Sequence, residues 1–247
     1  MVFVGDFLYV ADTGNHSIRR IHLKSGEVMT LAGNGKQGRY VSDFFREPLD
    51  AELNSPWDLS YYEGNLYIAM AGQHQVWKMN LNHLAIERYA GSGREDIVDG
   101  ALEHACFAQP SGIVTLGSHV FVVDSETSAV RDIEINRGVV STVVGKGLFD
   151  FGDRGGIGRE ARLQHPMGIT VDDERNALWI ADTYNSKIKR IDVQTSEVSA
   201  FKFSYQLNEP GGLSLFRDKM FIANTNDHQI IALDLKSRIA EVVDVRE

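Results

Sequence analysis

A short apolar motif occurs five times along the chain, and this repetition constrains the possible folds more than any other feature of the sequence. The copies lie at residues 8–13, 66–71, 120–125, 178–183 and 220–225. Successive copies begin 58, 54, 58 and 42 residues apart. Each copy is followed by a polar cluster and a second short apolar run, so each predicts two strands joined by a turn.

Proline precedes four of the five copies, at Pro56, Pro110, Pro166 and Pro210. Because proline donates no backbone hydrogen bond, it suits the first residue of a strand. A further short apolar run closes each repeat, at residues 28–33, 86–91, 139–145, 198–203 and 239–245. Each repeat therefore predicts four short antiparallel strands, which is the composition of a β-propeller blade.

We predict an all-β propeller in a single domain over residues 1–247, with blades at approximately residues 1–33, 56–91, 110–145, 166–203 and 210–247. Helical solenoids are disfavoured, because the apolar residues lack helical spacing and the runs are rich in Val, Ile, Tyr and Phe. The first repeat has no proline at its start. Either the five blades close as a small ring, or the chain is part of a protein with at least one further blade.

Charge and cysteine content exclude several classes of function. Lys and Arg total 25 against 34 Asp and Glu, and the resulting net charge of −9 argues against a nucleic-acid partner. Cys106 is the single cysteine, so the chain cannot form an internal disulfide or a CxxC redox pair. No apolar run is long enough for a membrane span, and no targeting segment is visible. We therefore expect a soluble protein with a cytoplasmic location and no membrane partner.

The predicted topology places the longest connections on one face. In a four-stranded meander, the turn between the second and third strands and the link to the next blade emerge on the same side. The links at residues 34–55, 92–109, 146–165 and 202–209 are longer than the turns predicted on the opposite side. Loops on a rigid scaffold are common binding sites, so we expect this long-loop face to carry any binding function.

The repeats also provide an internal control, because a residue type found at one position in most repeats is explained by the fold. Asp12, Asp124, Asp182 and Asn224 share a position at a strand end, where they are expected to cap backbone N–H groups of the following turn. The second repeat departs most from this pattern. Its candidate binding residues are Trp57, Asp58, Met70, Gln73 and His74. Local repacking is the alternative to a contact patch at the channel mouth.

The link at residues 147–158 is the second candidate, with Phe149, Asp150, Asp153 and Arg154 as binding residues. It lacks the alternating oxygen ligands and distal Glu of a calcium loop, so we predict no metal there. A simple long connector is the alternative. The basic run at residues 187–190 alternates with apolar positions and predicts a solvated strand face.

No catalytic constellation is visible elsewhere. The G-x-G-x-x-G run at residues 33–38 is followed by no amphipathic helix, and its first two glycines recur as Gly91-Ser92-Gly93 and Gly145-Lys146-Gly147. The eight histidines lack the spacing of a metal motif, and no motif fixes a histidine or lysine beside Cys106. We therefore predict no catalytic residues, no metal and no cofactor.

The Ala-Asp-Thr-x-Asn-x-x-Ile pattern of the first and fourth repeats, together with Gln-His-Pro-Met-Gly-Ile at residues 164–169, resembles the NHL repeat. More narrowly, residues 55–58, 68–77, 107–112 and 208–213 resemble NHL propellers that are fused to a thioredoxin-like domain. This resemblance implies a six-bladed propeller, of which the chain would carry five blades without the redox domain. It also implies that the unusual residues of the second repeat are shared within the family.

Two hypotheses for function follow. The first is a non-catalytic interaction or scaffold module that binds a protein or peptide on its long-loop face and positions an attached thioredoxin-like domain. The alternative is a metal-dependent enzyme that resembles lactonase and lyase propellers, with a divalent cation held in the central channel by Asp58, Asp124 and Asp182. RNA binding is a third possibility through Lys187 and Lys189, but it needs a basic loop face that the net charge disfavours.

Overall fold

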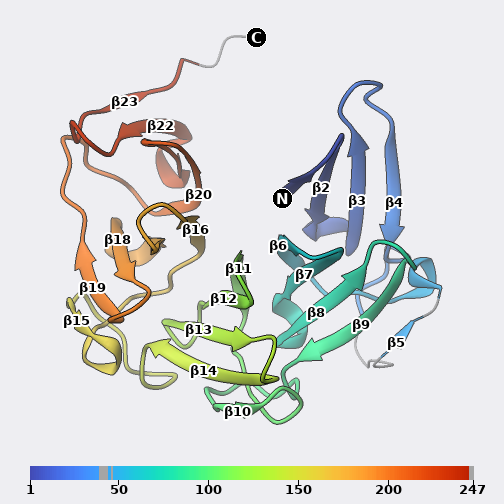
Figure 1. Ribbon diagram of the computed structural model, residues 1–247. Helices are drawn as coiled ribbons and strands as arrows, with labels where there is room; N and C mark the ends of the chain where they lie inside the picture. The colour runs from blue at the N-terminus through green and yellow to red at the C-terminus, as the bar shows by residue number, and fades with distance from the viewer. Residues whose placement is uncertain (39–43, 46, 245–247) are drawn as a thin grey trace. The chain divides into compact units, whose positions relative to one another are not determined.

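The computed structural model describes residues 1–38, 44–45 and 47–244, and it is built almost entirely of antiparallel strands (Figure 1). The strands form five sheets, and each sheet is one blade. The predicted all-β fold of propeller type is therefore confirmed. By its internal contacts the chain divides into two compact units, Met1–Val122 with Asp132–Ser141, and Val123–Arg131 with Thr142–Glu247.

Four consecutive strands of each blade run antiparallel in chain order. Blade one consists of β1 (Val2–Val4), β2 (Phe7–Asp12), β3 (Ser17–His22) and β4 (Val28–Ala32). Blade two consists of β6 (Pro56–Tyr62), β7 (Asn65–Met70), β8 (Gln75–Asn80) and β9 (Ala85–Ala90), and blade three of β11 (Pro110–Leu116), β12 (His119–Asp124), β13 (Ala129–Glu134) and β14 (Val139–Val144). Blade four consists of β16 (Gly168–Asp172), β17 (Ala177–Asp182), β18 (Lys187–Asp192) and β19 (Glu197–Ala200), and blade five of β20 (Pro210–Phe216), β21 (Lys219–Asn224), β22 (Gln229–Asp234) and β23 (Ala240–Val242). The last predicted run extends to Val245, which lies outside the described residues.

The first strand of blade four begins two residues later than the proline predicts. Pro166 has no N–H with which to enter the ladder, and Met167 N–H is the first to donate, to the Ala181 carbonyl at 3.2 Å. The paired register then starts at Gly168, opposite Ala181.

Three blades have a fifth strand that the sequence analysis did not predict. The link that precedes each of these blades places two residues against the blade's outermost strand: β5 (Phe44–Phe45) pairs with β9, β10 (Gly100–Ala101) with β14, and β15 (Gly156–Ile157) with β19. Short 3₁₀ turns follow β5 and β15, as η2 (Pro48–Asp50) and η4 (Gly158–Glu160). The links therefore cover strand edges that would otherwise be unpaired.

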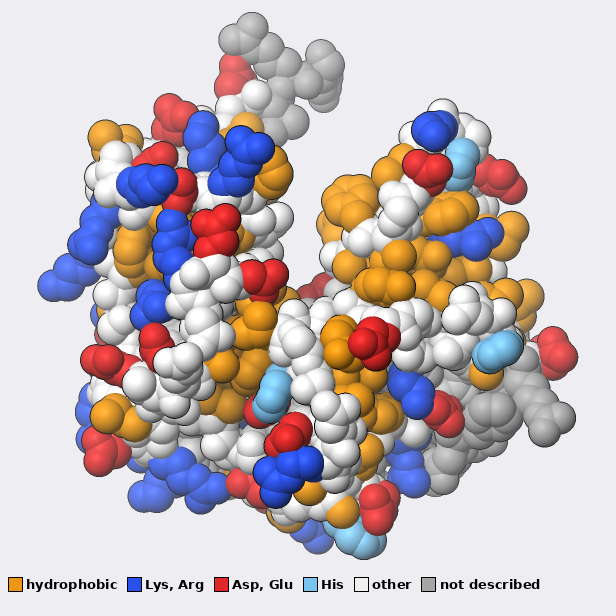
Figure 2. All heavy atoms as spheres, in the orientation of Figure 1, with side chains coloured by type: hydrophobic (Ala, Val, Ile, Leu, Met, Phe, Trp, Pro, Cys, Tyr) orange, Lys and Arg blue, Asp and Glu red, His pale blue; other side chains and the backbone are white. Residues whose placement is uncertain are grey.

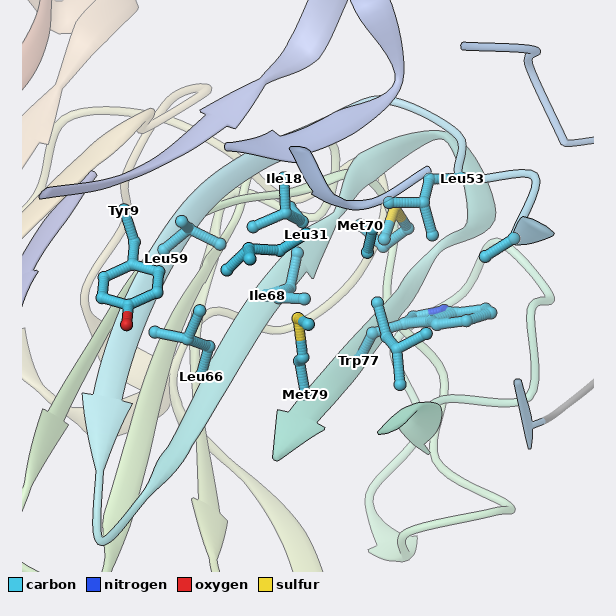
Figure 3. Close-up of a cluster of buried hydrophobic side chains, with 13 residues drawn as sticks. Tyr9, Ile18, Leu31, Leu53, Leu59, Leu66, Ile68, Met70, Trp77 and Met79 are labelled. Atoms are coloured by element: carbon cyan, nitrogen blue, oxygen red, sulfur yellow. The ribbon is translucent and has the colours of Figure 1, made fainter. Parts of the chain in front are cut away.

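The core lies between neighbouring blades. We call the face of a blade that is directed toward the next blade along the chain its trailing face, and the opposite one its leading face. In the cluster of Figure 3, Tyr9 and Ile18 from the trailing face of blade one pack on Ile68 and Met79 from the leading face of blade two. Tyr67 and Val76 pack in the same way on blade three, and Trp179 and Ile188 on blade five. Because one blade cannot bury both faces, stacking the repeats creates the core.

The turns between the second and third strands have one repeated shape. In four blades they are 3₁₀ turns, namely η1 (Thr13–Asn15), η3 (Ala71–Gln73), η5 (Thr183–Asn185) and η6 (Thr225–Asp227). The residue after each turn, and its equivalent Ser128 in blade three, is left-handed with φ between 49° and 55°. No helix within the described part of the chain is long and apolar enough to cross a membrane.

Candidate functional site

The repeated acidic position at the end of the second strand is part of a polar network. Asn15 donates to the Asp12 carboxylate at 2.9 Å, and Asn185 donates to Asp182 at 2.7 Å. Asp182 also accepts the Gln164 backbone N–H at 2.7 Å. The prediction that Asp12 and Asp182 cap the backbone of their own turns is wrong, because neither makes a cap hydrogen bond there. Their partners are a turn side chain and, for Asp182, the preceding inter-blade link.

A basic residue seven positions later completes this network. Arg19 lies 3.0 Å from Asp12, and Lys189 lies 2.8 Å from Asp182. The equivalent pair in blade three, Arg131 with Asp124 at 3.6 Å, is fully buried. Burial raises the pKa of Asp182, and the nearby Lys189 ammonium partly offsets that effect. The predicted solvated basic strand is therefore wrong for Lys189, which is 1% exposed.

Blade two replaces this charged pair with an apolar one. Met70 and Trp77 occupy the two positions, and both are fully buried (Figure 3). The Trp77 indole donates to the Gln75 amide oxygen at 3.0 Å, and Gln75 in turn donates to the Gly91 carbonyl at 3.2 Å. The structure thus places the candidate residue Met70 in the core and away from solvent.

The other candidates of blade two have separate surroundings. Asp58 lies in β6, where its carboxylate accepts the Ile113 N–H of the neighbouring strand β11 at 3.2 Å and the Met1 ammonium at 2.8 Å. Trp57 is 43% exposed. Gln73 is buried, and its amide atoms have no hydrogen-bond partner among the described residues. The structure therefore places these residues in different local environments.

The link at residues 146–165 is held in a defined shape by its polar residues. Asp150 forms an ion pair with Arg162, and the Arg154 guanidinium donates to the Glu160 carbonyl. Asp153 binds Lys187 and, at 3.1 Å, Lys189. Burial raises the pKa of Asp153, but the hydrogen bonds and charges of these lysines outweigh that effect and lower it overall.

The same link exposes aromatic side chains. Phe149 is 90% exposed and Phe151 is 51% exposed. Tyr184 of the adjacent turn is 54% exposed and stacks on His165 at 4.7 Å between ring centroids. Figure 2 shows Lys and Arg side chains beside hydrophobic ones on the surface around β15. Of the predicted site residues, Phe149 is thus the most accessible apolar group, while Asp150, Asp153 and Arg154 support the loop that carries it.

The three carboxylates of the metal hypothesis already have donors. Asp58 accepts a backbone N–H, and Asp124 and Asp182 face Arg131 and Lys189. Over residues 1–38 and 47–244, no group of three or more His, Cys, Asp or Glu side chains is arranged to hold a metal ion. Asp124 and Asp182 would have to lose their basic partners before they could bind a cation.

Sequence reasoning missed a contact that joins successive blades, which we call the clasp. The side chain of the left-handed residue after each turn accepts the backbone N–H of the residue before the next blade's proline. The four contacts are His16 with Ser55, His74 with Gln109 and Ser128 with His165, each at 3.1 Å, and Ser186 with Glu209 at 3.2 Å. His74, a predicted binding residue, therefore has a structural partner. The recurrence of His or Ser at this position was the available signal.

A second hydrogen bond strengthens three of these joints. The hydroxyl of the first turn residue donates to the proline carbonyl of the next blade: Thr13 to Pro56, Ser125 to Pro166 and Thr183 to Pro210. Blade two has Ala71 at this position and no such hydroxyl.

The chain is similar to curated proteins over nearly its whole length. It is 36% identical to NHL repeat-containing protein 2 of Homo sapiens over 99% of this chain and 40% of that protein. It is 37% identical to Protein SUPPRESSOR OF QUENCHING 1, chloroplastic, of Arabidopsis thaliana over 93% of this chain and 24% of that protein. The chain thus spans less than half the length of either relative. No family model matches it.

Solved structures share the fold at lower sequence identity. A streptogramin B lyase structure aligns with 98% of this chain and 66% of its own, with a TM-score of 0.62 and 14% identity. At that identity the likeness describes the fold alone.

Proposed function

We infer, from the premise that this chain is an NHL-type β-propeller similar to part of NHL repeat-containing protein 2, that it is a non-catalytic interaction module. Its proposed binding surface is the long-loop face, centred on Phe149 and Phe151. The observation that supports this most is the 90% exposure of Phe149 on a loop that ion pairs and backbone contacts hold in place. A preordered loop loses little conformational freedom on binding.

The charge of this link suggests the kind of partner. Residues 146–165 carry four basic and three acidic side chains, whereas residues 92–109 carry one basic and four acidic ones. The adjacent strand β18 adds Lys187, which is exposed, beside the link. We propose that the partner is a protein or peptide with an apolar anchor for Phe149 and acidic residues around it.

Selection of a displayed random-peptide library on the whole chain tests this surface. We expect the selected peptides to combine acidic with aromatic or aliphatic residues, and Phe149→Ala to weaken them at least about tenfold, as expected for an interface anchor. Phe216→Ala is the matched control, because Phe216 is an exposed phenylalanine of blade five. Selected peptides that bind the Phe149→Ala and parent proteins equally would contradict the proposal.

The candidate residues of blade two belong to this proposal in a reduced form. Trp57 is the accessible member and Asp58 is partly exposed, while Met70 and Gln73 are buried and His74 joins two blades. We propose Trp57 as a secondary contact. Trp57→Ala would then weaken the selected peptides less than Phe149→Ala does, and an effect larger than that of Phe149→Ala would shift the site to blade two.

The natural context that we propose is a longer protein that includes a thioredoxin-like domain, with the propeller positioning that domain. The resemblance of residues 55–58 and 68–77 supports this context. Sequencing the DNA that adjoins the coding region of this chain tests the proposed context, and adjoining non-coding sequence would contradict it. We propose a cytoplasmic location, although the name of the Arabidopsis relative places that protein in the chloroplast. Imaging of the tagged protein decides between the two compartments.

The competing enzyme hypothesis makes a different prediction. A lyase-like propeller would contain stoichiometric divalent cation, lost together with activity in Asp58→Ala. The interaction module would bind its selected peptides unchanged after treatment with a chelator. Metal analysis and peptide binding on the same preparation therefore separate the two functions.

A further inference from the structure

We propose that His16 and His74 make the joints from blade one to blade two and from blade two to blade three sensitive to pH. In both joints the acceptor of the clasp is the imidazole Nδ1 atom, 3.1 Å from the donating backbone nitrogen. An imidazole can accept a hydrogen bond at Nδ1 only when that nitrogen carries no proton. The clasp therefore exists only with a neutral histidine.

Protonation removes the acceptor and provides no replacement. The imidazolium has two N–H donors and no lone pair, so no rotation of the ring can restore the contact to the backbone N–H. The charged ring would instead direct an N–H toward the N–H of Ser55 or Gln109. Histidine is the side chain whose charge ordinarily changes within the physiological pH range.

The other blades show that the acceptor need not titrate. Ser128 and Ser186 occupy the same position, with the same left-handed backbone, and accept the equivalent N–H through a hydroxyl. A serine hydroxyl keeps its lone pairs at any pH in this range. The fold thus contains two kinds of joint with one geometry, and only the histidine joints depend on the proton concentration.

The joint after blade two depends most on its histidine. Thr13 supports the His16 joint with a second hydrogen bond, to the Pro56 carbonyl at 2.7 Å. Ala71 stands at that position beside His74 and has no hydroxyl. We therefore expect acidification to loosen the contact between His74 and Gln109 more than the contact between His16 and Ser55.

No charged side chain of the described residues forms an ion pair with either ring, although the segments packed around them carry charges. Around His16 these are Asp12, which binds Arg19, and Lys36, Glu47, Asp50 and Glu52. Around His74, residues 92–109 carry Arg94 and Asp96, which pair with each other at 3.1 Å, and Glu95, Asp99, Glu103 and His104. None of the described charged side chains lies within 4.0 Å of either imidazole in an ion pair. The proton would therefore act mainly through loss of the acceptor.

Amide hydrogen exchange on the whole chain tests the proposal, with rates corrected for the intrinsic effect of pH. When the pH is lowered from about 8 to about 5.5, the range over which histidine side chains ordinarily gain a proton, we expect the protection of the Gln109 amide to fall about two- to tenfold, the loss expected for one hydrogen bond. The Glu209 amide, whose acceptor is Ser186, should keep its protection. In His74→Ser, the Gln109 amide should behave like that of Glu209, and His16→Ser should do the same for Ser55.

Two results would overturn the proposal. One is a Gln109 amide whose corrected protection depends on pH no more than that of Glu209. The other is a pH dependence that survives unchanged in His74→Ser. Because serine occupies this position in two other blades, His74→Ser is expected to fold, and circular dichroism of the variant provides the check.

Discussion

Individual residues in this fold are best understood against their equivalents in the other blades. The last residue of the second strand is a buried acid with a basic partner seven residues later in blades three and four. The same two positions hold Met70 with Trp77 in blade two, and Asn224 with Ile231 in blade five. The two positions therefore change together, because a buried charge without a partner is very unfavourable. An uncharged or apolar pair serves the same packing role.

Replacing Lys189 alone should destabilise the protein strongly. In Lys189→Ile the Asp182 carboxylate stays buried without its cation, so we expect the free energy of unfolding to fall by about 3–5 kcal/mol. The double variant Asp182→Asn/Lys189→Ile, which copies blade five, should recover most of this loss. Urea unfolding of the parent, the single variant and the double variant measures these free energies. Lys187→Ile removes an exposed cation and should cost less than about 1 kcal/mol; an equal loss in that variant would refute the argument.

The interaction of Asp153 with Lys187 and Lys189 predicts that the stability of the protein depends on pH through a carboxylate that loses its charge in acid. The pKa of Asp153 is lowered in the fold, so its carboxylate stabilises the protein above the ordinary aspartate pKa of about 3.9. That contribution is lost as the pH falls through the lowered value. The stability difference between the parent and Asp153→Asn should therefore be present at neutral pH and shrink toward the acid limit, as measured by thermal unfolding at a series of pH values.

At the scale of the element, the glycine that follows the fourth strand explains the repeated Gly-x-Gly runs. Gly33, Gly91 and Gly145 have φ of 94°, 105° and 109°, a region that residues with a side chain rarely adopt. A Cβ atom on Gly145 would also lie 2.6 Å from the Ala129 Cβ. These glycines let the link leave the blade close to the third strand, which confirms that the runs are repeat turns.

Gly145→Ala should therefore destabilise the protein more than an alanine at another left-handed glycine. Gly117 has φ of 56°, and a Cβ there would have no heavy atom within 4 Å. Gly117→Ala thus isolates the backbone penalty of about 1–2 kcal/mol, and Gly145→Ala should exceed it because of the added clash. Chemical denaturation compares the two variants, and equal losses would show that the contact with Ala129 relaxes freely.

At the scale of the whole molecule, stability comes from blade faces that cover one another. The aromatic residue in the middle of the second strand is at most 5% exposed at Tyr9, Tyr67, Phe121 and Trp179, but Phe221 is 38% exposed. The equivalent aliphatic residue of the third strand is fully buried at Ile18 and Ile188, while Ile230 is 38% exposed. Blade five thus keeps an aromatic and an aliphatic residue at these two positions, but its trailing face is less covered than those of the other blades.

This difference predicts unequal effects of equivalent substitutions. Phe121→Ala removes a fully covered ring and should lower the free energy of unfolding by about 3–5 kcal/mol. Phe221→Ala should lower it by less than half as much, because part of that ring already contacts water. Thermal and urea unfolding measure both variants. Equal losses would mean that Phe221 is covered in solution by a surface outside its own blade.

The number of blades, the order of their strands and the positions of their turns could all be predicted from the amino-acid sequence. Residues of one hairpin are close in the chain, so the short apolar runs and the prolines and glycines that bound them were enough to place β2, β7, β12, β17 and β21. The sequence also indicated Phe149 as a candidate, since the link that contains it departs from the repeat.

Which polar residues meet across blades became clear only from the packed fold. The clasp joins His74 to Gln109, which are 35 positions apart, and the extra strand β15 pairs with β19, whose paired residues are 40 and 42 positions apart. Lys189 has the sequence pattern of a surface residue, and it is buried because Asp182 and the preceding link surround it. Such contacts depend on how two faces pack, and periodicity within one strand carries no information about the residue on the opposing face.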